Sequence, residues 1–145
     1  MNEWEAIEDW ELLAQFCQAY RTFSDAFMEQ IGTHRAQATV LCRLFLQDGL
    51  TQSELAQQLS IQGATVTPML QRLEEAGFVL RCRDPEDNRL VRVYLTDAGR
   101  QKERVITGQF MKVQEAAFSG MSDVERALFR RMLKQLLHNM AEQRA

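Results

Sequence analysis

The chain has few cysteines and no long apolar run, and each shortage excludes a class of protein. Its three cysteines, Cys17, Cys42 and Cys82, lack the C-x-x-C spacing of a thiolate zinc site. Because the number of cysteines is odd, a framework of disulfides is also not indicated, and we expect reduced thiols. No apolar run approaches the roughly 18 residues of a membrane-spanning helix, and residues 1–5, with acidic side chains at Glu3 and Glu5, do not resemble a signal peptide. These absences predict a cytoplasmic protein with no membrane partner.

Groups that carry catalytic or metal chemistry are also sparse. The two histidines, His34 and His138, stand apart from each other and from the cysteines, so the sequence predicts no metal site. It contains no phosphate-binding G-x-x-x-x-G-K segment, and no motif supports a Ser-His-Asp or Cys-His arrangement. We therefore expect neither an enzyme nor a bound cofactor.

Composition and charge favour one small helical domain with an uneven charge distribution. The 145 residues are 46% hydrophobic and 26% charged, with only two prolines and seven glycines, which is typical of a single, mainly helical globule. The net charge of −3 argues against a nonspecific nucleic-acid binder. However, acidic residues gather near the N-terminus, whereas five arginines lie within residues 72–92. These are Arg72, Arg81, Arg83, Arg89 and Arg92.

Residues 51–96 contain the densest set of structural signals. Thr51 and Glu54 form a predicted capping box at the start of a short helix, in which each side chain accepts from the other residue's backbone N–H. After a break at Ser60, apolar residues recur at i, i+3, i+4 and i+7 and predict a second helix that begins near Gln62 and ends at Gly77. The apolar positions are Val66, Met69, Leu70 and Leu73. The pattern therefore predicts a helix-turn-helix.

Two runs of alternating residues follow this helix pair. Residues 78–83 and 90–95 are candidate strands, because their side chains alternate at the period of a strand. The polar segment Asp84-Pro85-Glu86-Asp87-Asn88-Arg89 lies between them and predicts a turn. The two strands and their turn form a predicted wing beside the helix-turn-helix.

At this point the sequence resembles the MarR (multiple antibiotic resistance regulator) family of winged-helix transcription factors. The resemblance rests on Leu55-Ala56 with Leu59, Thr67-Pro68-Met69-Leu70, Arg72-Leu73-Glu74, Gly77-Phe78-Val79, and Asp84-Pro85-Glu86-Asp87-x-Arg89 leading into Leu95-Thr96. It implies a mainly α fold with a small β-wing, forming one domain over residues 1–145. Residues 33–96 would be the DNA-binding lobe, and residues 1–32 and 97–145 the dimerisation helices. It further implies a homodimeric repressor of a pseudo-palindromic double-stranded DNA operator, released by a small aromatic ligand.

The predicted DNA-binding residues fall into three groups. One face of the second helix would enter the major groove, because its side chains are small or hydrogen-bonding and Arg72 can hold a guanine or a phosphate. At the wing tip Arg89 would enter the minor groove with Asp87 as its bidentate partner. Residues at the start of the first helix would bind phosphate. The full set is Gln52, Ser53, Gln62, Ala64, Thr65, Thr67, Pro68, Gln71, Arg72, Arg83, Asp87, Asn88 and Arg89. Pro68 lies just beyond the first helical turn, so we expect a slight kink and not a break.

Apolar stripes extend on both sides of the proposed lobe. We expect one long amphipathic helix over residues 4–31, a helix capped by Thr33, and a helix from Thr96 to residue 120. A capping box beginning at Ser122 should start the last helix. These stripes are wider than a small monomer can bury, which independently indicates a dimer.

Two alternatives remain open. Some MarR-like regulators sense organic hydroperoxides through a thiol near the start of the first helix, and Cys17 is the candidate here, although it lies well inside that helix. The simpler interpretation is that all three cysteines are small apolar residues on buried faces. The second alternative is a winged-helix protein-interaction module that never touches DNA. Arginines on both strands and at the wing tip argue against it, and a salt-sensitive gel shift would separate the two functions.

Overall fold

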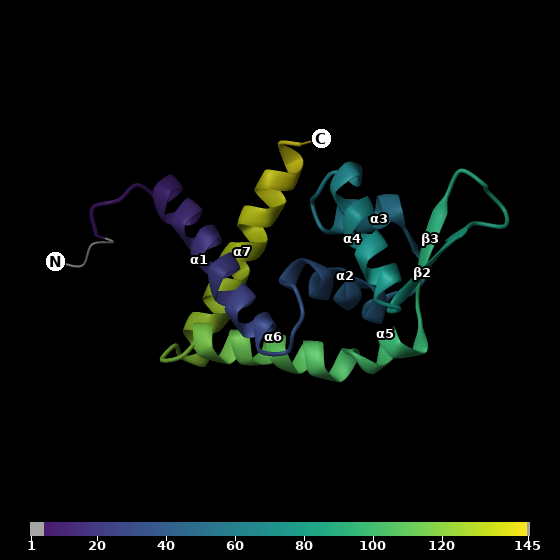
Figure 1. The fold of residues 1–145 in the computed structure, drawn as a ribbon. Coiled ribbons are helices and arrows are strands. Elements are labelled where there is room, and N and C mark those ends of the chain that lie inside the picture. Colours follow the sequence, from purple (N-terminus) through teal and green to yellow (C-terminus); the bar gives the residue numbers. More distant parts are fainter. Residues whose placement is uncertain (1–4, 145) are drawn as a thin grey trace. The chain divides into compact units, whose positions relative to one another are not determined.

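The computed structural model describes residues 5–144, which form a mainly helical chain with one small sheet (Figure 1). The elements in order are α1 (Asp9–Glu29), α2 (Arg35–Leu46), β1 (Leu50–Thr51), α3 (Gln52–Gln58), α4 (Gly63–Glu75), β2 (Val79–Arg83), β3 (Val91–Leu95), α5 (Asp97–Gln101), α6 (Glu103–Ala117) and α7 (Asp123–Glu142). The chain divides into two compact units, one ending at Val113 and the other beginning at Gln114. Within residues 5–144 no helix has both the length and the apolar character needed to cross a membrane.

The first unit contains the predicted winged helix-turn-helix. Its three strands form an antiparallel sheet in the order β1-β3-β2, and the β2–β3 hairpin projects from the lobe with its loop at the far end (Figure 1). The predicted alternation is confirmed, because Val79, Val93 and Leu95 are buried against the helices whereas Leu80 and Tyr94 are exposed on the other face. The wing thus has one face in the core and one in solvent.

The core of this unit lies between α2, α3, α4 and the sheet. On α4 the predicted apolar face is confirmed, because Val66, Leu70 and Leu73 are buried and Met69 packs against them. Pro68 lies inside α4 without interrupting it, as expected for a proline just beyond the first turn. The helix is followed by Gly77 with φ of +82°, the left-handed conformation that glycine adopts without strain. The fold therefore directs one face of α4 inward and leaves the other in solvent.

Three of the predicted helix caps are formed. Glu54 N–H donates to Thr51 Oγ1 at 3.1 Å, and Thr51 N–H donates to Glu54 Oε2 at 2.8 Å. The same reciprocal bonds join Ser122 and Glu125 at the start of α7. Thr96 Oγ1 accepts from Gly99 N–H at 3.0 Å. Each cap satisfies backbone donors that a helix start otherwise leaves unpaired, so these helices begin where the sequence predicted.

Three predicted helix boundaries are wrong. The first helix begins at Asp9, because Glu8 is extended and acts as its N-cap; Trp4 lies outside the described residues. Thr33 does not cap α2, since His34 occupies the N-cap position without a side-chain bond. The single helix expected after Thr96 is two helices, because Lys102 N–H bonds to Gly99 O at 3.1 Å, a tighter i→i−3 bond that separates α5 from α6.

The second unit comprises the end of α6, a turn and α7. The rings of Phe118 and Phe129 meet edge to face with centroids 5.7 Å apart, and the Arg126 guanidinium lies over Phe118 and pairs with Glu115 at 3.4 Å. Residues 123–142 of α7 include no buried side chain. Its large exposed apolar residues are Val124, Leu128, Met132, Leu136, Leu137 and Met140. Within the second unit, this apolar face remains uncovered.

Candidate nucleic-acid interface

The exposed face of α4 collects the residues predicted to read the major groove. All of them are exposed to solvent, on the side opposite the buried Val66, Leu70 and Leu73. They are Gln62, Ala64, Thr65, Thr67, Pro68, Gln71 and Arg72. At 100° per residue, positions 64 to 72 of this set cover one continuous arc of the helix. Short polar side chains with a single arginine give this face the shape and the donors needed to approach base edges.

Contacts around this face join α3 to α4. Gln52 Nε2 lies 3.4 Å from Thr67 Oγ1, so the start of α3 is beside the middle of the exposed α4 face. Ser53 is exposed next to it. Gln71 Nε2 donates to Glu75 Oε1 at 3.2 Å, and within residues 5–144 Arg72 forms no ion pair. The Arg72 guanidinium therefore keeps its donors available for a guanine or a phosphate.

The tip of the wing presents Arg89 with the bidentate partner that the sequence predicted. Arg89 Nε and Nη2 each donate to the Asp87 carboxylate at 3.0 Å, yet the Arg89 side chain is 89% exposed. These bonds lower the pKa of Asp87 and raise that of Arg89, so both remain charged at neutral pH. A fully charged guanidinium at the end of a projecting hairpin is suited to the negative potential of a narrow minor groove.

Arg83 and Asn88 lie close together across the wing loop. Arg83 Nη1 donates to the backbone carbonyl of Asn88 at 2.7 Å, and both side chains are exposed. This bond places a second positive charge next to the tip. It also connects the end of β2 to the far side of the loop.

Two of the five arginines counted toward the positive face have structural partners instead. Arg81 Nη2 pairs with Glu74 Oε1 at 3.3 Å, and Arg81 N–H donates to Glu74 Oε2 at 2.8 Å; these bonds lower the pKa of Glu74, the backbone bond most. Arg92 pairs with Asp84. Their side chains are only 23% and 31% exposed and their charges are neutralised locally. Arg89 is also paired, with Asp87, but it is 89% exposed, and within residues 5–144 Arg72 and Arg83 have no carboxylate partner.

Sequence reasoning missed two structural features that hold the wing. One is β1, whose residues Leu50 and Thr51 pair with Val93 and Arg92; two residues are too few to show a strand periodicity. The other is Asp84, whose Oδ1 accepts from the N–H groups of the residues two and three positions later. An aspartate before proline signals such a turn, but the sequence does not show its pairing with Arg92.

The cysteines are less buried than expected. Cys17 and Cys82 are exposed and Cys42 is partly buried, so the interpretation of all three as buried apolar residues is wrong for the first two. Cys17 lies within α1 on a face that a single chain leaves open. Burial raises the pKa of the Cys42 thiol, which disfavours its reactive thiolate form.

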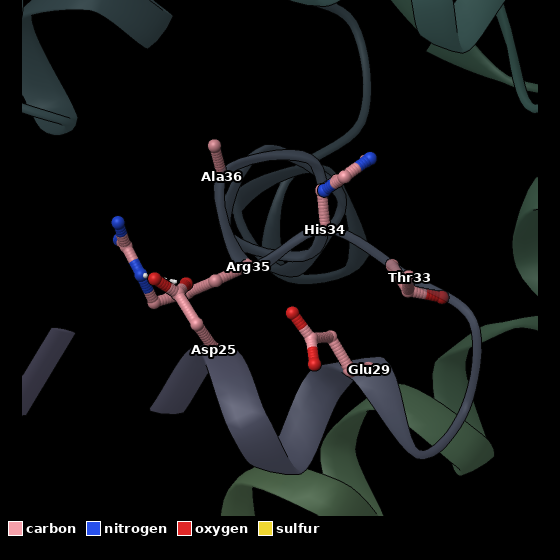
Figure 2. A pocket seen from close by; sticks show the side chains of 6 residues that line it. All are labelled: Asp25, Glu29, Thr33, His34, Arg35 and Ala36. Atoms are coloured by element: carbon pink, nitrogen blue, oxygen red, sulfur yellow. Dashed lines mark hydrogen bonds and ion pairs between the residues drawn. The ribbon is translucent and has the colours of Figure 1, made fainter. Parts of the chain in front are cut away.

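A small polar pocket lies where α1 is followed by α2 (Figure 2). It has a volume of about 210 Å³ and is lined by Asp25, Glu29, Thr33, His34, Arg35 and Ala36. Arg35 Nε pairs with Asp25 Oδ1 at 2.8 Å, and the Glu29 carboxylate points from α1 toward the start of α2. Because the residues that line the pocket are mostly polar or charged, the pocket offers few apolar contacts to a neutral aromatic ligand. Within residues 5–144 no group of three or more His, Cys, Asp or Glu side chains is placed to hold a metal ion.

Comparisons with known proteins agree with the arrangement of helices and wing. The model of the MarR family matches residues 34–91. The chain is 30% identical over 133 residues to the uncharacterised HTH-type transcriptional regulator YdgJ of Bacillus subtilis, covering 92% of this chain and 81% of that protein.

Two solved structures extend the similarity to nearly the whole chain. A crystal structure of MarR matches with a TM-score of 0.81 and 28% identity, covering 97% of this chain and 95% of the other. The complex of S. aureus MepR with DNA matches with a TM-score of 0.82 and 26% identity, covering 92% and 98%. The chain therefore belongs to the MarR family of transcriptional regulators.

Proposed function

We propose that this regulator is a homodimeric repressor that binds a pseudo-palindromic double-stranded DNA operator, with α4 in the major groove and the wing in the minor groove. The position of Arg89 carries the proposal. Its guanidinium is 89% exposed at the end of the hairpin and is oriented by Asp87, an arrangement with no contribution to the core. The similar S. aureus MepR was solved bound to DNA.

Each predicted contact has a distinct chemical task. The exposed α4 face, residues 62–72, approaches base edges: Arg72 binds a guanine or a phosphate, and the methyl groups of Thr65 and Thr67 meet thymine. Gln52 and Ser53 bind phosphate at the start of α3. In a two-fold dimer the two α4 helices bind half-sites roughly 34 Å apart or a multiple of this distance, which explains why the operator would be pseudo-palindromic.

The unburied apolar faces support the dimer. Residues 33–96 form the proposed DNA-binding lobe, and residues 1–32 and 97–145 supply the dimerisation helices of one domain. Trp10, Phe16 and Tyr20 on α1 are 71%, 45% and 44% exposed, and the apolar residues of α7 are exposed as well. Exposing so much apolar surface in water is unfavourable, and a second copy of the chain would cover it.

We include release by a small aromatic ligand in the proposal. A ligand that binds better to a dimer geometry unable to span both half-sites lowers operator affinity by the corresponding coupling free energy. The aromatic side chains on α1 are the candidate contacts for such a ligand: the ring centroids of Phe23 and Phe27 lie 4.9 Å apart, and Phe23 is 37% exposed. The regulator would act in the cytoplasm, where it meets the chromosome.

The most direct test uses the purified protein to select fragments of genomic DNA, followed by sequencing of the bound fragments. We expect enrichment of a pseudo-palindrome and an affinity that falls steeply as salt rises, because phosphate contacts release counterions. A protein-interaction module would retain no double-stranded fragment at any salt concentration, and that result would reject the proposal.

Replacing Arg89 by alanine tests the wing itself. We expect operator affinity to fall at least about tenfold while the dimer persists, since the change removes the minor-groove contact of each subunit's wing and no core packing. Gel shifts give the affinity and analytical ultracentrifugation the mass. Arg89→Lys keeps the charge but not the two-pronged geometry and should fall in between. Unchanged affinity of Arg89→Ala would refute the wing assignment.

A further inference from the structure

A continuous series of polar contacts runs from the turn after α2 to the wing tip. At its centre, Arg92 of β3 donates from Nη1 to the carbonyl oxygen of Gly49 at 2.9 Å and from Nε to Asp84 Oδ2. Asp84 Oδ1 accepts from Asp87 N–H at 3.1 Å, and the Asp87 carboxylate binds Arg89. We call Gly49, Arg92, Asp84 and Asp87 the wing relay. It connects residues that are up to 43 positions apart in the sequence.

The inner end of the wing relay is fixed to the helix-turn-helix. Gly49 N–H donates to the Val93 carbonyl at 3.0 Å. The neighbouring Asp48 accepts from Leu95 N–H at 2.8 Å and from Arg100 Nη2 at 2.7 Å. Gly49 is followed directly by β1, and Thr51 of β1 is the N-cap of α3. The Gly49 carbonyl therefore belongs to the segment from which the helix-turn-helix begins.

The middle of the wing relay is sheltered from water, unlike its outer end. The Asp84 side chain is 11% exposed and that of Arg92 is 31%, whereas that of Arg89 is 89%. The bond from Arg92 lowers the pKa of Asp84, followed by the bond from Glu86 N–H, so this carboxylate is ionised at neutral pH. Charge-assisted bonds between partly buried groups are stronger and better defined than those between exposed groups.

The wing loop has few other restraints. Asp84 N–H donates to the Leu90 carbonyl, and Leu90 N–H to the Asp87 carbonyl, which closes the loop on itself. Arg83 holds Asn88 in the same way. These bonds define the shape of the loop but not its direction relative to α4. Contacts that cross from the wing to other elements define that direction. At its base Arg81 of β2 bonds to Glu74 of α4, and Arg92 of β3 bonds to Gly49; of these two arginines, Arg92 also holds the wing loop, through Asp84.

We propose that Arg92 and Asp84 are positioning residues that set where Arg89 lies relative to α4, and that they contribute to operator affinity without touching DNA. This inference rests on the proposed function. Its physical basis is preorganisation: the wing and α4 must bind one duplex at the same time, and a wing that is already correctly oriented loses less freedom on binding. Both prongs of the Arg92 guanidinium are needed, because one binds the wing loop and the other binds the helix-turn-helix.

The test compares Arg92→Gln, Asp84→Asn and the double variant in operator binding. Each single change should weaken binding by about tenfold, and the double change should be no weaker than the singles, because all three break the same link. Hydroxyl-radical footprints should lose the minor-groove protection made by the wing, whereas methylation protection in the major groove by α4 should remain. Arg92→Lys should bind the operator as weakly as Arg92→Gln, since its single ammonium cannot bond to Asp84 and to the Gly49 carbonyl in the geometry of the guanidinium.

A matched control is available away from the wing and from the apolar face of α7. The Arg35 side chain is 29% exposed and pairs with Asp25 at 2.8 Å, so Arg35→Gln removes a comparable pair that belongs neither to the wing nor to the proposed DNA contacts. We expect it to leave affinity within about twofold of the wild type, as is usual for a half-exposed pair away from the binding surface.

The possible outcomes separate this inference from the proposed function. If the wild type binds no DNA, the proposed function fails. A second outcome is that the wild type binds and Arg89→Ala binds more weakly, but Arg92→Gln or Arg92→Lys binds as well as the wild type. In that case the positioning role of Arg92 and Asp84 is refuted and the proposed function stands. Equal loss of both groove protections together with a lower melting temperature would show a general structural effect and would also refute the positioning role.

Discussion

Replacing Gly99 by alanine is expected to lower the free energy of unfolding by about 3 kcal/mol, the upper end of the usual cost of overpacking a core. A Cβ at this buried position would lie 2.1 Å from the Phe78 carbonyl oxygen and 3.3 Å from Leu95 Cδ2. The carbonyl belongs to the backbone and accepts from Thr96 N–H at 3.1 Å. It therefore cannot move away without breaking the junction between β3 and α5.

The control for this prediction is the same substitution at Gly108 in α6. A Cβ there would meet nothing within 4 Å, so Gly108→Ala should raise stability by up to about 1 kcal/mol through helix propensity. Urea unfolding followed by circular dichroism, at one protein concentration for all variants, measures both changes. If Gly99→Ala unfolds at the same urea concentration as Gly108→Ala, the close approach of α5 to Phe78 is not a feature of the folded protein.

The parts of the fold that sequence predicted correctly depend on residues close together in the chain. The partners of the capping box, Thr51 and Glu54, are three positions apart, and Asp87 and Arg89 are two positions apart. The inward face of α4 follows from the helical repeat of apolar residues. Such features need no knowledge of the rest of the fold, so the helix-turn-helix and the wing tip could both be recognised from sequence.

The parts that sequence could not predict depend on long-range pairing. Arg92 meets Gly49 across 43 positions and Arg100 meets Asp48 across 52. Both contacts require β1 to lie beside β3 with Leu50 opposite Val93, and a two-residue strand has no periodicity to reveal it. For the same reason, sequence counted Arg92 as part of the DNA-binding face, although its charge is used to orient the wing.

Helix boundaries and cysteine exposure show a related limit. The apolar stripe of α1 continues through residues that are not helical, since periodicity reports which side chains are apolar and not where hydrogen bonding begins. Cys17 has the size and polarity of a core residue, yet it is exposed on a face that a single chain does not cover. Burial in a dimeric protein depends on the partner chain, about which local composition says little.

Breaking the dimer is expected to have the largest effect on DNA binding. Changing Leu128 and Leu136 together to glutamate places two charges on the exposed apolar face of α7, where these residues are 49% and 39% exposed. Burying unpaired carboxylates between two subunits is strongly unfavourable, so the variant should be a monomer of 16.8 kDa. A monomer contacts one half-site and loses the effective concentration, on the order of millimolar, that assists the second lobe, so operator affinity should fall at least about 100-fold.

Lys134→Glu provides the matched control, because it changes the net charge by the same two units. At 100° per residue, Lys134 lies about 200° around α7 from Leu136, on the side away from the apolar face. This variant should stay dimeric and lose little operator affinity beyond the effect of added negative charge. Analytical ultracentrifugation, circular dichroism and gel shifts on the same samples distinguish dissociation from unfolding. A folded, dimeric Leu128→Glu/Leu136→Glu protein would show that the apolar face of α7 is not the dimer contact, and the face of α1 around Phe16 and Tyr20 would then have to form that contact without α7.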